Sequence, residues 1–231
     1  ADPPDAGPPV LTDWKIEMNP KQEYGDPITC HYQYQGGTEG ATVIEWYREV
    51  LEGVPNAGTE EGAWEPIPNN NSIKYQPNVD DHNKRIKIFI TPVRQDGTAG
   101  PTYQHILERL VLPVHVGDNV ARCMREIAQK GTSFICTAFD PRNQYAPPTP
   151  KRILLGDKQI KIKVLEGEKT EIKTKIGPQC CQVKAWPHDP RCLELVITPS
   201  KTVPQQKQMS FMCEDGNTRD IVVLVLRAIA Q

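Results

Sequence analysis

Lysines alternate with aliphatic residues in two neighbouring segments, and no other pattern in the chain points as clearly to a binding surface. In the segment 160–164, Lys161 and Lys163 fall on one side of an extended strand and the aliphatic residues fall on the other. Lys173 and Lys175 repeat the pattern a few residues later. If the two strands pair as a hairpin, the four lysines line one exposed surface.

The wider segment 151–175 carries eight basic and four acidic side chains, a net charge of +4. Such a patch attracts an acidic protein segment or an acidic lipid headgroup. The alternative is that the lysines are the solvated face of an antiparallel sheet and bind nothing. The candidate partner-binding residues are Lys151, Arg152, Lys158, Lys161, Lys163, Lys173 and Lys175.

Other residue types that do chemistry do not form a recognisable site. Cys180, Cys181, His188 and Cys192 lie close in sequence, but structural zinc sites use cysteine pairs separated by two to four residues. The sequence contains no Gly-x-Ser-x-Gly motif, no His-Glu-x-x-His motif and no phosphate-binding glycine loop before a helix. We therefore expect a protein that is not an enzyme and that uses no cofactor or metal.

The composition predicts a mostly β protein of one or two domains. Twenty-two prolines and sixteen glycines in 231 residues indicate many turns. The net charge of −2 gives no global attraction to nucleic acid. No apolar run approaches the roughly 20 residues of a transmembrane helix, so we expect no membrane span.

Seven cysteines cannot all pair, and their spacing forms no regular disulfide framework. In a secreted immunoglobulin domain, Cys30 would need a partner in the strand 85–90, which has no cysteine. This favours a reducing compartment with free, buried thiols. The glycosylation sequon at Asn70 keeps the alternative open, which is a secreted or cell-surface immunoglobulin-like adhesion protein.

Residues 10–116 are expected to form an immunoglobulin-like β-sandwich after a linker at residues 1–9. A glycine-rich turn at 35–41 joins two alternating strands, and Trp46 in the second is placed to pack in the core. Turn signals recur about every ten residues, and the segment 107–116 is predicted to be the closing strand.

Residues 117–231 are expected to form a pleckstrin-homology-like β-barrel with a C-terminal helix. Val120, Met124, Ile127 and Ala128 predict a helix at 118–130, and a series of short strands follows. The segment 221–226 has the composition of a buried strand. A cap at Asn217 or Thr218 and an apolar stripe of Ile221, Leu224, Val225 and Ala228 favour a helix at 218–230 instead.

Several short motifs recur in order and together resemble a known family. They are Gly36-Gly37-Thr38-Glu39-Gly40, Ile44-Glu45-Trp46, the run from Ile88 to Gly97 with Gly100, the run from Asn119 to Phe139, Lys161-Ile162-Lys163-Val164 and the run from Arg219 to Gln231. The chain resembles the last immunoglobulin-like repeat and terminal module of the auxin-induced in root cultures nine family, microtubule-associated proteins of plants with relatives in protists.

This resemblance implies a cytoskeletal scaffold in the cytoplasm, at the cell cortex or in flagella. The implied partner is tubulin or another microtubule-associated factor, docked by the terminal module. In the plant protein, a basic N-terminal region outside these residues is the expected microtubule binder. Because these residues lack that region, the resemblance does not by itself imply that they bind tubulin directly.

Overall fold

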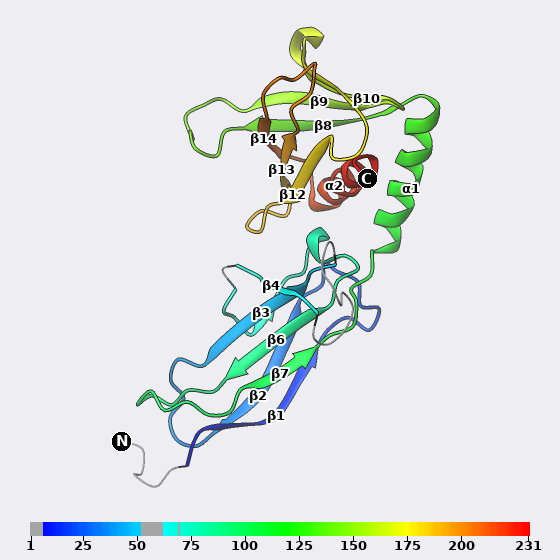
Figure 1. The fold of residues 1–231 in the computed structure, drawn as a ribbon. Helices are drawn as coiled ribbons and strands as arrows, with labels where there is room; N and C mark the ends of the chain where they lie inside the picture. The colour runs from blue at the N-terminus through cyan, green and yellow to red at the C-terminus, as the bar shows by residue number, and fades with distance from the viewer. Residues whose placement is uncertain (1–6, 52–61, 69) are drawn as a thin grey trace. The chain divides into compact units, whose positions relative to one another are not determined.

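The chain divides into two compact units, Ala1–Leu112 and Pro113–Gln231 (Figure 1). The structure is a computed structural model that describes residues 7–51, 62–68 and 70–231. Residues 1–6 of the expected linker lie outside the described residues. The fold is mostly β with two α-helices in the described part, which confirms the predicted fold class.

The first unit has two antiparallel sheets, arranged as in an immunoglobulin-like sandwich. One sheet has the strand order β1-β2-β5 and the other β4-β3-β6-β7. The strands are β1 (Val10–Glu17), β2 (Ile28–Gln35), β3 (Val43–Glu49), β4 (Trp64–Pro66), β5 (Lys74–Tyr75), β6 (Ile86–Thr91) and β7 (Tyr103–Ile106), with a 3-10 turn at Val79–Asp81.

Trp46 lies at the centre of the first unit, as its position in an alternating strand predicts. Its side chain is 1% exposed, and its indole Nε1 donates a hydrogen bond of 2.8 Å to the backbone oxygen of Ser72. The turn before this strand needs glycine, because Gly36 and Gly37 have φ values of 107° and 106°. Cys30 is buried in the same core as a free thiol.

The prediction of a closing strand at 107–116 is wrong. The last strand, β7, ends at Ile106, and only isolated bridges at Leu110 and Val111 follow it. Pro113 then supplies the cap position of a helix that begins at Val114. The valines at 114 and 116 have high strand propensity, but the proline removes a backbone donor and starts the helix.

The second unit is built on a seven-stranded antiparallel sheet of order β11-β10-β9-β8-β14-β13-β12. Each strand pairs with the next one within β8–β11 and within β12–β14, and β8 pairs with β14, the arrangement expected for a pleckstrin-homology-like module. The strands are β8 (Thr132–Phe139), β9 (Thr149–Leu155), β10 (Gln159–Val164), β11 (Thr170–Lys175), β12 (Cys181–Ala185), β13 (Cys192–Ile197) and β14 (Lys207–Met212), with a 3-10 turn at Glu166–Glu168.

The predicted barrel is not closed. In the described residues, β11 and β12 are the outer strands and share no ladder. The C-terminal helix reaches the connection between them, where the backbone nitrogen of Gln179 donates to the backbone oxygen of Ala230. The opening is therefore bordered by the helix end instead of being sealed by strand pairing.

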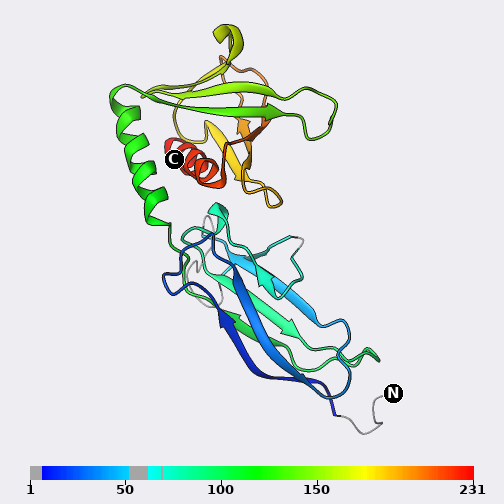
Figure 2. The same ribbon diagram turned by 180° about the vertical axis from the view of Figure 1, so that it is seen from behind.

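The C-terminal helix α2 (Gly216–Ile229) packs against β12 and β13, and α1 (Val114–Gln129) packs against α2 (Figure 2). Of the expected apolar stripe only Val225 is buried, because Ile221 and Leu224 are half-buried and Ala228 is exposed. Because a sheet and a second helix both cover α2, its buried surface is wider than one stripe. The buried apolar residues are Val222, Val223, Val225, Leu226 and Ile229.

The helix cap lies two residues before the predicted one. Asp215 accepts a hydrogen bond of 2.7 Å from the backbone nitrogen of Thr218, so it is the N-cap of α2. Asp215→Ala should lower the free energy of unfolding by about 1 kcal/mol, the usual cost of losing such a cap. Urea unfolding measures the loss, and Glu214→Ala on the exposed neighbour is the control. Equal effects of the two substitutions would refute the cap assignment.

Candidate functional site: the lysine face

The two lysine-bearing segments form adjacent antiparallel strands, as the alternation predicts. In the β10–β11 ladder, Ile162 lies opposite Ile172 and Lys161 lies opposite Lys173. Ile160, Ile162 and Ile172 are buried. Because side chains alternate along a strand, the lysines lie on the other face of the sheet, toward solvent.

Five of the seven candidate residues share this outer face of β9, β10 and β11. We call this set the lysine face: Arg152, Lys161, Lys163, Lys173 and Lys175. Strand pairing places Arg152 opposite Lys163, and Lys175 opposite Gln159. Lys173 and Lys175 are exposed, whereas the other three are half-buried.

The structure does not bring Lys151 and Lys158 onto the lysine face. Lys151 alternates with Arg152 and has the same parity as Ile153 and Leu155, which are buried. It lines a cavity of about 470 Å³ on the inner side and pairs with Glu171. Lys158 lies in the exposed turn between β9 and β10.

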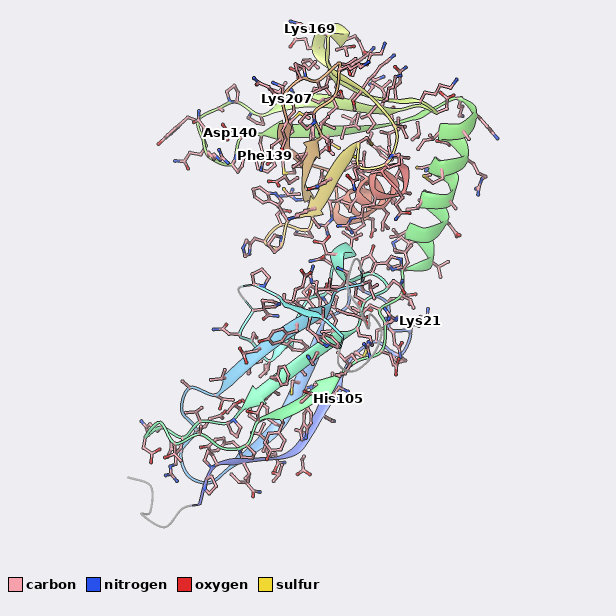
Figure 3. All side chains as sticks on the ribbon, viewed as in Figure 1. Lys21, His105, Phe139, Asp140, Lys169 and Lys207 are labelled. Carbon is pink, nitrogen blue, oxygen red and sulfur yellow. The ribbon has the colours of Figure 1, made fainter. Side chains whose placement is uncertain are left out.

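One pair of basic residues on the lysine face shares a carboxylate within the unit. Arg152 and Lys163 lie opposite each other, and Glu168 lies 3.6 Å from the guanidinium of Arg152 and 3.3 Å from the ammonium of Lys163. Glu168 belongs to the turn between β10 and β11, where Figure 3 labels its neighbour Lys169. This carboxylate lowers the net charge of the group from +2 to +1 and so offsets part of the repulsion between the two cations.

A second pair has no such compensation. Lys161 and Lys173 lie directly opposite each other in the ladder, and neither has an ion pair with any residue in the described part of the chain. Like charges at directly opposed positions of an antiparallel pair are destabilising. The lysine face therefore holds an uncompensated positive pair beside a compensated one.

Apolar side chains border the lysine face, and sequence reasoning missed them. Ile135 on β8 lies opposite Arg152 and is 57% exposed, and Leu154 lies opposite Lys161. A hollow of about 300 Å³ beside Lys161 is lined in part by Ser133 and Leu154. Both faces of β8 carry apolar residues, so the hydrophobic periodicity of the sequence does not show that Ile135 points outward.

The remaining sequence candidates do not gather into a site. In the described ranges 7–51, 62–68 and 70–231, no three histidine, cysteine or acidic side chains are placed to hold a metal ion. Cys180 and Cys181 touch only as chain neighbours, with their sulfurs 4.0 Å apart. Of the helices in the part of the chain that the structure describes, none is long and apolar enough to span a membrane.

Comparison with known proteins gives matches over both units. Residues 15–107 match the family model of the AIR9 A9 domain. The 187-kDa microtubule-associated protein AIR9 of Arabidopsis thaliana is 26% identical over 233 residues, which cover 94% of this chain and 12% of that protein.

Among solved structures, the sporulation control protein Spo0M from Bacillus subtilis matches with a TM-score of 0.34 and 10% identity, over 97% of this chain and all of that one. The relationship is based on the sequence matches. The chain resembles the AIR9 family, and its sandwich unit resembles the A9 domain of that family.

Proposed function

We propose that the chain is a non-enzymatic part of a cytoskeleton-associated protein, in which the sandwich is a spacer and the second unit docks a partner. The resemblance to AIR9, a protein named as microtubule-associated, supports this assignment. The chain spans 12% of the length of that relative, so it corresponds to one region of a larger protein. No constellation of catalytic residues in the described part competes with this interpretation.

The docking surface in this proposal is the lysine face, and its partner is an acidic protein segment. The main support for the proposal is the Lys161–Lys173 pair. Both lysines lie on the solvent side of the sheet, and neither forms an ion pair with a carboxylate of the described residues. An acidic segment would supply the missing negative charge, as Glu168 does for Arg152 and Lys163. Ile135 and Leu154 add an apolar border that favours a polypeptide over a free ion.

The expected partner chemistry is that of the acidic, glutamate-rich tails of tubulin. Exposed ion pairs contribute about 1 kcal/mol or less each and are screened by salt. Docking on this face should therefore be weak, salt-sensitive and dependent on several contacts at once. A single charge change would alter affinity only a few-fold.

A matched pair of variants tests this proposal. Lys161→Gln with Lys173→Gln removes the uncompensated pair, and Arg152→Gln with Lys163→Gln removes the same charge from the compensated pair. In co-sedimentation with microtubules, the first double variant should bind about 10-fold more weakly, for two contacts of about 0.7 kcal/mol each. The second should lose less than threefold. Equal losses, or no binding by the wild-type chain, would contradict the proposal.

Two controls separate binding from folding and from lipid recognition. Without a partner, the Lys161→Gln, Lys173→Gln variant should be as stable as the wild type or a few tenths of a kcal/mol more stable, because the repulsion is gone. Microtubules trimmed of their acidic tails should not bind the wild-type chain. Binding to phosphoinositide vesicles, with none to microtubules, would assign the face to lipid instead.

The same proposal predicts recruitment in cells. Reversal of Lys161, Lys163, Lys173 and Lys175 to glutamate should abolish recruitment to cytoskeletal filaments. Reversal of four exposed lysines elsewhere leaves recruitment intact with the same net charge; a suitable set is Lys15, Lys21, Lys74 and Lys184. Unchanged localisation of the first variant, with intact folding, would remove the lysine face from the mechanism.

A further inference from the structure

Two buried cysteines face each other across the pairing of β8 and β14. The ladder pairs Ser210 with Phe139 and Met212 with Thr137, so Cys213 is the next residue opposite Cys136. Their sulfur atoms lie 3.6 Å apart, and the two residues are 77 positions apart in the chain. Directly opposed residues of an antiparallel pair have Cβ atoms within about 5.5 Å, a separation from which a small shift reaches disulfide geometry.

The cysteine pair lies beside the shortest ladder of the sheet, where a covalent bond would reinforce weak strand pairing. Only three residue pairs join β8 to β14 in the described ladder, whereas each of the other ladders of this sheet has five or more. A cavity of about 470 Å³ opens beside the same strands, lined in part by Ala138 and Ser210. The β8–β14 ladder thus has the fewest paired residues of the ladders in this sheet, and the cavity opens at its Phe139–Ser210 end, the end away from the cysteines.

Cys213 also connects this junction to the C-terminal helix. It lies two residues before Asp215, the N-cap of α2, and its backbone nitrogen donates to the backbone oxygen of Arg191 at 2.9 Å. A covalent bond from Cys136 to Cys213 would therefore tie the first strand of the unit to the entry of its last helix. It would close a loop that contains most of the unit.

We propose that Cys136 and Cys213 are a redox-active pair that forms a reversible disulfide. The oxidant is a low-molecular-weight disulfide such as oxidised glutathione. The thiolate of Cys136 attacks one sulfur of glutathione disulfide and releases one glutathione thiolate, which leaves a mixed disulfide. The thiolate of Cys213 then attacks the Cys136 sulfur and releases the second glutathione. Two protein thiols lose two protons and two electrons, and glutathione disulfide is reduced to two glutathione molecules.

The environment of Cys136 fits its role as the first attacking thiol, whereas the hydrogen-bonding contact with Cys136 and burial raise the pKa of the Cys213 thiol and slow the second step. The hydrogen-bonding contact with Cys213 lowers the pKa of the Cys136 thiol, although burial acts in the opposite direction. Cys136 is 2% exposed and Cys213 is 4% exposed, so the attack requires the short β8–β14 ladder to separate as far as the cysteines. Reaction should therefore be slow in the folded protein and should accelerate under mild destabilisation.

The other cysteines provide an internal comparison. In the described chain, Cys180 and Cys181 are the other two sulfurs in contact, but they are adjacent residues, which strains a disulfide between them. The Cys181 thiol lowers the pKa of Cys180 to about 6, so Cys180 is expected to take up glutathione as a mixed disulfide. Such an adduct at Cys180 is distinct from the proposed bond and has a different mass.

The test is oxidation of the whole purified chain with excess oxidised glutathione, followed by alkylation under denaturing conditions and peptide mapping. We expect a cross-linked peptide that joins Cys136 to Cys213, with a mass 2 Da below that of the two free peptides. Cys136→Ala and Cys213→Ala should each abolish it, and Cys180→Ala should leave it unchanged. In the wild-type chain, free or singly glutathionylated Cys136 and Cys213, or their pairing with other cysteines, would overturn the proposal.

A thermal measurement adds a second readout. Closing a loop of this length should raise the melting temperature of the second unit by about 10 °C or more. Addition of dithiothreitol should reverse the rise, and the Cys213→Ala variant should show none. A cross-link that forms without stabilising the second unit would show that the bond distorts the fold, and would refute a role in locking it.

Discussion

Trp46→Ala is expected to lower the free energy of unfolding of the first unit by about 3–5 kcal/mol, the usual range for deletion of a buried indole. The side chain is almost fully buried, and its ring lies 5.5 Å from that of Tyr75. The substitution also removes the hydrogen bond that the indole donates to the backbone oxygen of Ser72. The cavity and the lost hydrogen bond act in the same direction.

Hydrogen exchange followed by mass spectrometry measures this effect separately in each unit. Peptides from the first unit should lose protection in Trp46→Ala, while peptides from the second unit should change little. Trp46→Phe keeps most of the apolar volume and should cost about 1–2 kcal/mol, chiefly from the lost hydrogen bond. Trp64→Ala, which removes a half-buried indole, is the matched control and should cost clearly less. A loss below 1 kcal/mol in Trp46→Ala would show that this core does not depend on Trp46.

Glu49→Gln should destabilise the first unit by about 3 kcal/mol, because it removes the charge that holds two arginines together. The Glu49 side chain is fully buried and accepts hydrogen bonds on both oxygens. Arg85 lies 2.9 Å from Oε1, and Arg109 lies 2.7 Å from Oε2. Because both arginines are partly exposed, the cost stays at the lower end of the range for a broken buried ion pair.

The pKa of Glu49 determines how the stabilisation by this residue changes with pH. Burial alone would raise the pKa of Glu49, but the hydrogen bonds from Arg85 and the charges of Arg109 and Arg85 outweigh it and lower the pKa. A lowered pKa in the folded state means that the stabilisation is complete above the ordinary value of about 4.3 and is lost as the pH falls through the folded value.

Denaturant titrations at several pH values between 3 and 7 would measure the difference in stability between the wild type and Glu49→Gln. The difference should be constant above about pH 5 and should shrink below about pH 4. Glu45→Gln, at an exposed position of the same strand, should show a small, nearly constant difference. A difference for Glu49→Gln that grows on acidification would contradict the charged role of Glu49.

The fold follows from the sequence wherever one physical signal dominates. The alternation in Ile160–Val164 is a two-residue period with lysine outside and isoleucine inside, and the strand β10 has this arrangement. The glycine turn before Trp46 needs backbone conformations that few other residues adopt. In both places, local preference and burial favour the same structure.

Prediction failed where two signals competed. The segment 107–116 is rich in β-branched and aliphatic residues, but Pro113 starts a helix within it. The apolar stripe of α2 did not predict that the helix is buried on two sides. That burial depends on packing against α1, β12 and β13, which the local sequence does not reveal. The lysine face was only partly predictable. Lys151 and Arg152 are neighbours on a strand and therefore lie on opposite faces of the sheet, but which of them faces solvent is known only once the pairing of β9 is known.

The position of β11 at the edge of the sheet has a consequence for solubility. In the described structure its outer side has no neighbouring strand, so its backbone donors and acceptors are open to pairing with another chain. Lys173 and Lys175 project from this strand, and charged side chains on an edge discourage aggregation by strand addition. The same charges that we propose for recruiting a partner would thus keep copies of the protein from associating edge to edge.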